Sequence, residues 1–279
     1  MKVGFVGTGT MGSLLIEAFV SSGALEPSQI NVSNRNFSKA QTVANRHPGI
    51  QAKTANAECA IGCNVVFLCV KPLEFKKVVD ELLPVVRPEQ LIVSITSPVM
   101  IEYLEEFMPC KIAKVIPSVT NSVLSGATLC IYGSRVEDED RSRLESLLSH
   151  ISQPLQIEES YTRIVSDISS CGPAFFACLL EQFIDAAVYE TGISKDEATS
   201  VASAMLLGTG LLLTEGGLTP ADVQAKVAVP GGITAQALRL LRRETEGVFN
   251  RLIQTTHAKF DEDVEKVSTA FYGKEVNGQ

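Results

Sequence analysis

Apolar and polar positions follow two different patterns along this chain. In the first half, short apolar segments rich in Val, Ile and Leu are separated by amphipathic stretches, which predicts strands connected by helices. The predicted strands are 3–6, 30–33, a weak one near residue 50, 65–70, 91–95, 111–115, 127–132 and an edge strand near 155–157. The predicted helices are 11–22, 37–46, 73–83, 100–107 and 137–149. Crossovers of this length are typical of a parallel, doubly wound sheet.

From about residue 161 onward the strand patterns stop and helical patterns take over. The predicted helices are 174–189, 194–213, a short one from 220, one that begins at Gly231 and Gly232, and 245–270. The first two are apolar around more than one face, and a small helical domain can hardly cover such helices by itself. We therefore predict an α/β domain of residues 1–160 and an all-helical domain of residues 161–279. The helical domain is expected to form a homodimer, or a higher homo-oligomer built on dimers.

The first predicted strand runs directly into a glycine-rich turn, G-T-G-T-M-G at residues 7–12. Gly7 permits the tight turn, Gly9 lets backbone amides approach a pyrophosphate, and Gly12 lets the next helix pack close to the strand. The N-terminus of that helix offers free N–H groups to phosphates. A G-x-G-x-x-G turn between a strand and a helix predicts a dinucleotide-binding domain of the Rossmann type.

The residues after the second strand indicate which dinucleotide is bound. A turn that binds NAD carries Asp or Glu here, about 20 residues after the glycines, to accept hydrogen bonds from the ribose. This chain instead reads Ser33-Asn34-Arg35. Ser33 and Asn34 can donate hydrogen bonds, and Arg35 can bind a 2′-phosphate through two N–H groups. The sequence therefore favours NADP(H), with NAD(H) left open.

Two further loops leave strands of the same sheet. Val70-Lys71-Pro72 follows the strand 65–70, and Thr96 follows the strand 91–95. Cofactors lie outside the carboxyl ends of parallel strands. We expect Lys71 beside a phosphate or ribose, Pro72 at the start of a helix, and Thr96 near the nicotinamide.

Composition excludes several other functions. The net charge is −8 and no cluster of Lys or Arg stands out, so neither a nucleic acid nor an acidic membrane is an expected partner. No uninterrupted apolar run reaches the ~18 residues of a membrane span, and no secretory signal precedes the first strand. The seven scattered cysteines form no C-x-x-C pair, so we expect no metal site. Reduced thiols are typical of a cytoplasmic protein.

Five motifs together resemble one known family. These are the glycine turn, Ser33-Asn34-Arg35, Val70-Lys71-Pro72, S-C-G-P-A-F at 170–175 and V-P-G-G-I-T at 229–234. They occur in the order and at the spacings of pyrroline-5-carboxylate reductases, and the resemblance covers essentially the full length. The G-P-A-F and P-G-G-x-T motifs are more specific than the glycine turn.

The resemblance implies a function. That family reduces the cyclic imine 1-pyrroline-5-carboxylate to L-proline with NAD(P)H, as a step of proline biosynthesis, and its helical domain interlocks with a second subunit. The cofactor-binding residues that we expect are Gly7, Thr8, Gly9, Thr10, Met11, Gly12, Ser33, Asn34, Arg35, Val70, Lys71, Pro72 and Thr96. The expected substrate-binding residues are Val229, Gly231, Gly232 and Thr234, with Thr234 catalytic.

The chemistry of the 229–234 turn agrees with this role. Gly231 and Gly232 leave amide N–H groups bare at a helix start, where a substrate carboxylate can bind. The Thr234 hydroxyl can bond the ring nitrogen. Hydride addition to a protonated imine needs placement and exclusion of water more than a strong base.

The sequence also departs from the family at two places. It reads I-P-S-V-T at 116–120 where the family usually reads M-P-N-T-P, and it has Val229 where the family usually has Ser. Such changes are similar to those in divergent reductase-like proteins encoded in bacterial late-competence operons.

Three alternatives follow. The chain could be a regulatory NADP-binding protein with weak or no activity. It could reduce another cyclic imine, with Asp185 or Tyr189 as proton donor. A β-hydroxyacid dehydrogenase is disfavoured, because residues 173–190 lack the lysine that such enzymes need.

Overall fold

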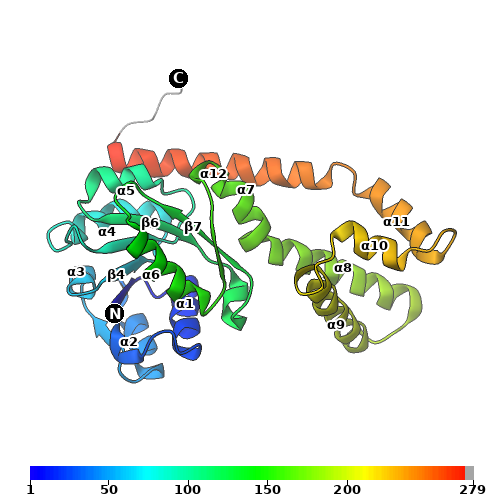
Figure 1. Cartoon of the computed structure of the whole chain (residues 1–279), viewed down its shortest axis with the longest axis horizontal. Coiled ribbons are helices and arrows are strands. Elements are labelled where there is room, and N and C mark those ends of the chain that lie inside the picture. Colours follow the sequence, from blue (N-terminus) through cyan, green and yellow to red (C-terminus); the bar gives the residue numbers. More distant parts are fainter. Residues whose placement is uncertain (274–279) are drawn as a thin grey trace. The chain divides into compact units, whose positions relative to one another are not determined.

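The computed structural model describes residues 1–273, and its N-terminal part is built on an eight-stranded sheet (Figure 1). The strand order is β3-β2-β1-β4-β5-β6-β7-β8. The strands are β1 (Val3–Val6), β2 (Ile30–Ser33), β3 (Gln51–Lys53), β4 (Val65–Leu68), β5 (Leu91–Ser94), β6 (Lys111–Ile116), β7 (Ala127–Tyr132) and β8 (Gln153–Gln156). The predicted doubly wound fold is confirmed.

One strand pair departs from the predicted parallel arrangement. β6 and β7 are antiparallel, whereas every other neighbouring pair in the sheet is parallel. Only a short 3₁₀ helix, η3 (Val119–Val123), lies between β6 and β7. A parallel pair needs a crossover of a dozen or more residues, so this connection returns the chain in the opposite direction.

Helices cover both faces of the sheet. α1 (Thr10–Ser21), α2 (Phe37–Arg46) and α6 (Asp138–Ser149) pack on one face. α3 (Asn56–Ala60), α4 (Phe75–Leu82) and α5 (Ile101–Phe107) pack on the other. Phe67 of β4 contributes to the first core and its neighbours Val66 and Leu68 to the second. This burial on two faces explains why β4 is apolar throughout.

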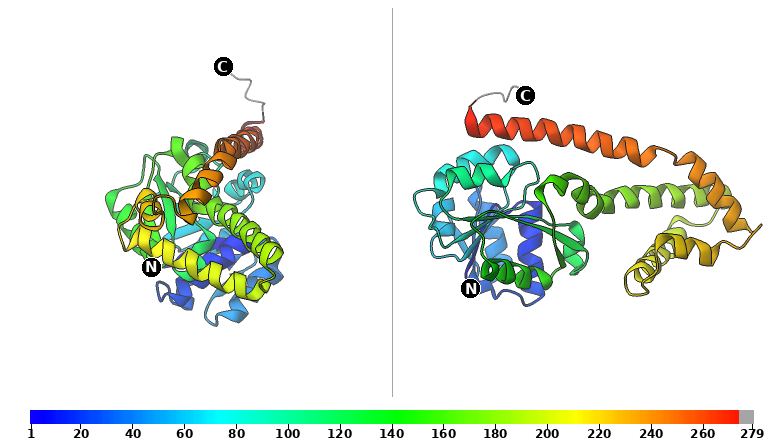
Figure 2. Two further views of the ribbon diagram at one scale, coloured as in Figure 1. Left: turned by 90° about the vertical axis from the view of Figure 1, so that its right-hand side faces the viewer. Right: turned by 45° about the horizontal axis from the view of Figure 1, so that its top comes forward.

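The last helix returns to the sheet. Val267 and Phe271, near the end of α12 (Val248–Tyr272), are buried in the same core as α4 and α5. The Tyr272 hydroxyl donates to Glu106 Oε2 at 2.6 Å. Figure 2 shows this end of α12, in red, beside the helices of that face.

Contacts divide the described residues into two compact units. The sheet unit consists of residues 1–173 and 255–273, and the helical unit is Ala174–Gln254. Residues 161–173, assigned to the helical domain from the sequence, pack with the sheet in this division. They include α7 (Thr162–Ser166) and a π-helical turn, η5 (Asp167–Cys171). The boundary of independently folding domains at residue 160 stays a prediction.

The helical unit contains four helices and the first residues of α12. The four helices are α8 (Gly172–Thr191), whose first residues lie in the sheet unit, α9 (Lys195–Thr214), α10 (Pro220–Val227) and α11 (Ile233–Glu244). Local chemistry explains their ends. The Ser194 side chain caps α9 by accepting from Glu197 N, Thr219 and Asp222 form a capping box on α10, and Gly192 follows α8 with φ 74°.

Two helical stretches stand out by hydropathy. Glu159–Thr191 and Lys195–Thr214 are long and apolar enough to cross a membrane by length and composition alone, although neither is one unbroken apolar run. They contain the helices whose apolar faces predicted a subunit partner.

Candidate dinucleotide-binding site

The glycine turn between β1 and α1 is shaped by close backbone packing. Gly7 has φ 103°, and a Cβ there would lie 2.4 Å from the Cys69 carbonyl oxygen. A Cβ on Gly12 would lie 2.2 Å from the Gly7 carbonyl oxygen. Gly9 differs, because no atom lies within 4 Å of its Cβ position. Gly7 and Gly12 are therefore required by the fold, whereas Gly9 faces open space at the N-terminus of α1.

The loop after β2 is fastened to this turn. Asn34 Nδ2 donates to Thr8 Oγ1 at 3.0 Å, and Asn34 Oδ1 accepts from the backbone N–H of Asn36 at 3.0 Å. Ser33 is buried and points away from solvent, with its hydroxyl donating to Asn56 Oδ1 at 2.8 Å. Asn34 therefore faces the turn, while Ser33 supports the first residues of α3.

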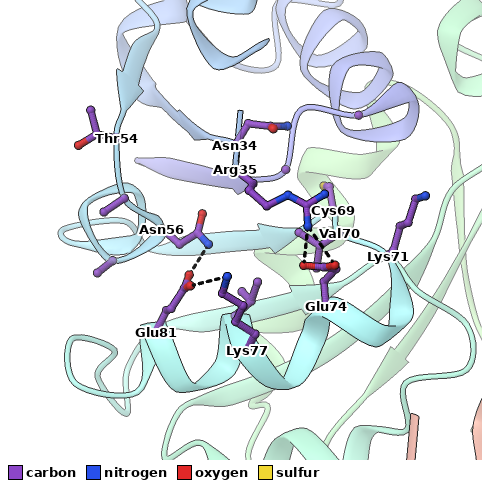
Figure 3. Close-up of a pocket in the computed structure, with 15 residues that line it drawn as sticks. Asn34, Arg35, Thr54, Asn56, Cys69, Val70, Lys71, Glu74, Lys77 and Glu81 are labelled. Atoms are coloured by element: carbon purple, nitrogen blue, oxygen red, sulfur yellow. Dashed lines mark hydrogen bonds and ion pairs between the residues drawn. The ribbon is translucent and has the colours of Figure 1, made fainter. Parts of the chain in front are cut away.

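Arg35 lies at the rim of the site and is the most exposed of these side chains. Its side chain is 81% exposed, and Nη1 lies 3.2 Å from Glu74 Oε1. Glu74 ends a 3₁₀ turn, η2 (Pro72–Glu74), that follows β4. Lys71 stands just before this turn and is also exposed. Figure 3 shows both cations and Glu74 around one opening.

These loops enclose one pocket of about 540 Å³. Of the predicted cofactor residues, the pocket is lined by Gly7, Gly9, Asn34, Arg35, Val70 and Lys71. Those outside the lining are Thr8, Thr10, Met11, Gly12, Ser33, Pro72 and Thr96. Two of these residues contact residues that do line the pocket. The Thr8 hydroxyl accepts a hydrogen bond from Asn34, and the Thr96 hydroxyl donates to the Val70 carbonyl at 3.2 Å. The structure thus brings loops after β1, β2 and β4 together, while contact with a cofactor stays a prediction.

Several lining residues escaped the sequence analysis. Asn56, Lys77 and Glu81 line the pocket from α3 and α4, together with Thr54, Ala55, Ala57, Cys69, Glu74 and Val78. Asn56 Nδ2 donates to Glu81 Oε2 at 2.6 Å. These residues were hard to predict from the sequence, because the strand before α3, β3, is short and partly exposed. The place where β3 ends was still informative, since it lies at the same edge of the sheet as the glycine turn.

A partly buried ion pair braces the neighbouring loop. Lys114 of β6 is fully buried, and its Nζ lies 2.5 Å from Glu159 Oε1 and 3.2 Å from the Ser97 carbonyl oxygen. The same Glu159 oxygen accepts from the backbone N–H of Ile101 at 3.0 Å. Burial lowers the pKa of Lys114, and the nearby Glu159 carboxylate opposes this effect. The pair holds the loop that carries Thr96.

The proposed substrate turn lies in the helical unit. Gly232 N donates to the Val229 carbonyl at 3.0 Å, and Gly231 between them has φ 76°. With Pro230 in the second position this is a type II turn. Gly232 is the N-cap of α11 and has no side chain to cap it, which leaves the amides of the first turn, including that of Thr234, to a ligand. Val229 is 63% exposed.

The other departure, Ser118, has a local role. It is buried, and its hydroxyl accepts from Thr120 N at 3.3 Å as the N-cap of η3. Asn121 completes this cap, because its Oδ1 accepts from Ser118 N at 2.8 Å. The residue that replaces the family's Asn is thus engaged with its own backbone.

Comparisons with known proteins agree with this fold and pocket. Residues 159–263 match the family model "Pyrroline-5-carboxylate reductase dimerisation", and residues 2–98 match "NADP oxidoreductase coenzyme F420-dependent". Pyrroline-5-carboxylate reductase 3 of Rattus norvegicus is 31% identical over 87% of this chain and 88% of its own length. The chain belongs to the pyrroline-5-carboxylate reductase family. ComE operon protein 4 of Bacillus subtilis (strain 168) is 41% identical over 98% of this chain and 100% of its own length.

Solved structures support the fold of this reductase family member. Plasmodium falciparum pyrroline carboxylate reductase, solved with NADP bound, has a TM-score of 0.81 at 22% identity and covers 97% of this chain and 98% of its own. The reductase of Coxiella burnetii has the same TM-score at 23% identity over 96% of this chain and 98% of its own. The predicted family and the two-part fold are confirmed.

Two features of the pocket agree with the NADP oxidoreductase family model that matches residues 2–98. Gly9 leaves room at the N-terminus of α1, and Arg35 and Lys71 place cations at the same opening. Among residues 1–273, no group of three or more His, Cys, Asp or Glu side chains is arranged to hold a metal ion.

Proposed function

We propose that this protein reduces 1-pyrroline-5-carboxylate to L-proline with NADPH. The observation that carries the proposal is the pocket at the carboxyl ends of β1, β2 and β4, where Arg35 lies beside the glycine turn. The chain belongs to a family named for this reduction. Proline biosynthesis and a cytoplasmic location follow from the same proposal and stay predictions.

The nucleotide would be held by three groups of this chain. The free amides at the start of α1 bind the pyrophosphate, Arg35 binds the 2′-phosphate, and Lys71 neutralises phosphate charge. Thr96, held against the Val70 carbonyl, stands on the loop expected near the nicotinamide. NADPH, when bound, supplies a hydride.

The imine would be held by the turn before α11. The Gly232 amide is already used in the turn, so the free amides of the residues that follow it, Ile233 and Thr234, bind the carboxylate, and the Thr234 hydroxyl bonds the ring nitrogen. Both contacts orient the imine carbon, and neither requires a strong base. Val229 offers no hydroxyl, which removes a hydrogen bond of ~1–3 kcal/mol relative to a serine.

A second copy of the chain would cover the apolar helices. Phe176, Phe183, Val201 and Leu207 are each more than half exposed on α8 and α9. The matched dimerisation model spans both helices, which favours a protein partner over a membrane. The proposed assembly is a homodimer or a larger oligomer built on dimers.

A kinetic assay tests the proposal. Purified protein is mixed with NADPH and pyrroline-5-carboxylate while the absorbance of reduced nicotinamide is followed. We expect turnover, and a loss of about tenfold in kcat/KM for Thr234→Ala, because one hydrogen bond to the charged ring nitrogen is lost. Thr245→Ala, at the other end of α11, is the matched control. Equal affinity for NADPH and NADH would refute the NADP preference.

Val229 supports a second candidate, a regulatory NADP-binding protein. The relative with 41% identity carries an operon name and no enzyme name. The regulatory function is supported if NADPH binds but is not oxidised while Val229→Ser restores turnover. Normal turnover of the unaltered protein supports the reductase. Oxidation of NADPH only with a different cyclic imine would assign another substrate.

A further inference from the structure

A carboxylate shares the rim of the nucleotide pocket with Arg35. Arg35 Nη1 lies 3.2 Å from Glu74 Oε1 and 3.3 Å from Glu74 Oε2, so one guanidinium nitrogen contacts both oxygens. The two residues are 39 positions apart, one after β2 and the other after β4. Figure 3 shows the Glu74 carboxylate directly beside the Arg35 guanidinium.

This contact changes how the end of β2 should be interpreted. NAD-binding domains of this type use a carboxylate at that point to accept hydrogen bonds from the ribose. The chain has none there in sequence, but the fold brings one from η2. A ligand group that contacts Arg35 Nη1 is therefore within reach of Glu74 as well.

The other carboxylate that lines the pocket, Glu81, is paired with residues other than Arg35. Glu81 accepts from Asn56 Nδ2 at 2.6 Å, and Lys77 Nζ lies 4.0 Å from its other oxygen. Lys71 lines the pocket next to η2. Of the two carboxylates in the lining, Glu74 is thus the one paired with Arg35.

We propose that Glu74, together with Arg35, determines whether the site prefers NADPH or NADH. This inference rests on the proposed nucleotide function. A 2′-phosphate must take Arg35 from Glu74 and meets the repulsion of its negative charge. A ribose 2′-hydroxyl can instead donate to the Glu74 carboxylate. Glu74 therefore weakens NADPH binding and strengthens NADH binding, whereas Arg35 has the opposite effect.

The effect is modest because the pair is open to solvent. The side chains of Arg35 and Glu74 are 81% and 41% exposed. Exposed ion pairs are weak and are screened by salt, so we expect changes in affinity of about threefold that shrink at high ionic strength.

Titration of the full-length protein with each nucleotide tests the proposal. Glu74→Gln keeps the shape of the side chain and removes its charge. We expect its Kd for NADPH to fall about threefold and its Kd for NADH to rise about threefold. Asp80→Asn on α4 is the matched control, since it removes the same charge from an exposed residue that does not line the pocket. It should leave the ratio of the two Kd values unchanged.

The outcomes separate this inference from the proposed function. The ratio of Kd values is measured within one variant, so it does not depend on the fraction of folded protein. If Glu74→Gln changes both Kd values by the same factor, or if Asp80→Asn shifts the ratio equally, Glu74 does not select the nucleotide. The proposed function survives that result if the unaltered protein still oxidises NADPH with the imine. If the unaltered protein binds neither nucleotide, both proposals fall.

Discussion

The sheet unit and the helical unit differ in how completely they bury their own apolar side chains. The sheet unit closes a core on each face, and Phe5, Phe19 and Phe67 are fully buried in one of them. Among the described residues, the core of the helical unit consists of Ile184, Ala198 and Ala202, with Leu180 and Val188 packed against it. A strand between two helix layers is covered by its own chain, whereas α8 and α9 leave large apolar side chains exposed in the single chain.

The same difference separates the two proposed binding sites. The nucleotide pocket is assembled from loops of the sheet unit and has its own walls. The turn before α11 is open, with Val229 63% exposed and Ile233 90% exposed. Nucleotide binding should therefore depend on one unit, while a dry substrate site needs additional cover.

The largest expected effect concerns the core of the sheet unit. Phe67→Ala removes a ring stacked on Phe5 at a centroid distance of 5.0 Å and tilted against Phe19 at 5.9 Å. We expect a loss of about 3–5 kcal/mol in the free energy of unfolding, measured with urea, because a cavity remains. The loss should not depend on protein concentration. If the loss depends on protein concentration, the core of the sheet unit is not stabilised by its own chain alone, and the two units do not differ in this way.

The next effect is alkaline destabilisation through a buried thiol. Burial raises the pKa of Cys110 from 9.0 to about 11. The neutral thiol is favoured in the folded state, so this contribution is complete below pH 9 and is lost as the pH rises toward 11. Between pH 9 and pH 11 we therefore compare how steeply the free energy of unfolding falls with rising pH in the unaltered protein and in Cys110→Ala. The slope of the unaltered protein should be steeper by about 1.4 kcal/mol per pH unit.

An apolar residue of the same core is the control for this measurement. Met108 is buried in the core that contains Cys110. Met108→Ala removes packing but no ionisable group, so it should leave the slope of the free energy of unfolding against pH unchanged between pH 8 and pH 11. If both variants flatten the profile equally, ionisation of Cys110 is not the cause.

A smaller effect tests the outside surface of the helical unit. Phe183 is 66% exposed in the single chain, and Phe183→Asp places a charge on the face proposed to meet a second copy. We expect the dissociation constant of the dimer to rise at least about tenfold, measured by sedimentation over a range of concentrations. Ile61→Asp, at a residue 55% exposed in the sheet unit, should leave the dimer intact. An unaffected Phe183→Asp dimer would place the interface elsewhere.

The smallest expected effect concerns Arg35 and tests whether the sheet unit binds the nucleotide. Arg35→Gln should raise the Kd for NADPH about fivefold, or about 1 kcal/mol, because an exposed charge contact is lost. The difference should shrink as salt is added. Arg243→Gln on α11 is the control and should have no effect on nucleotide titrations. Equal losses in both variants would show a general effect of charge.

Periodicity was sufficient to predict most of the architecture. The strands 3–6, 30–33 and 127–132 and the helix 37–46 begin and end where they were predicted. The antiparallel direction of β7 was missed, because strand direction depends on how the chain between two strands is routed. The π-helical turn η5 was missed as well, since no local pattern marks it.

Local sequence determined the features that act through the backbone. The glycines at 7 and 12 are required by contacts within one turn and its neighbouring strand, and the caps of α9 and α10 lie within four residues of the groups they satisfy. Such short-range geometry is encoded in consecutive residues, so the motif alone indicated a dinucleotide site.

Only the tertiary structure decided which distant side chains meet. Glu74 reaches Arg35 across 39 positions, Ser33 reaches Asn56 across 23, and Lys114 meets Glu159 across 45. These pairs depend on the order of strands in the sheet and on where each loop emerges. The sequence by itself predicted a turn that favours NADP(H), from Arg35 and the lack of an acidic residue at the end of β2. The fold supplied such a residue, because parallel strands bring loops from distant parts of the chain to one edge.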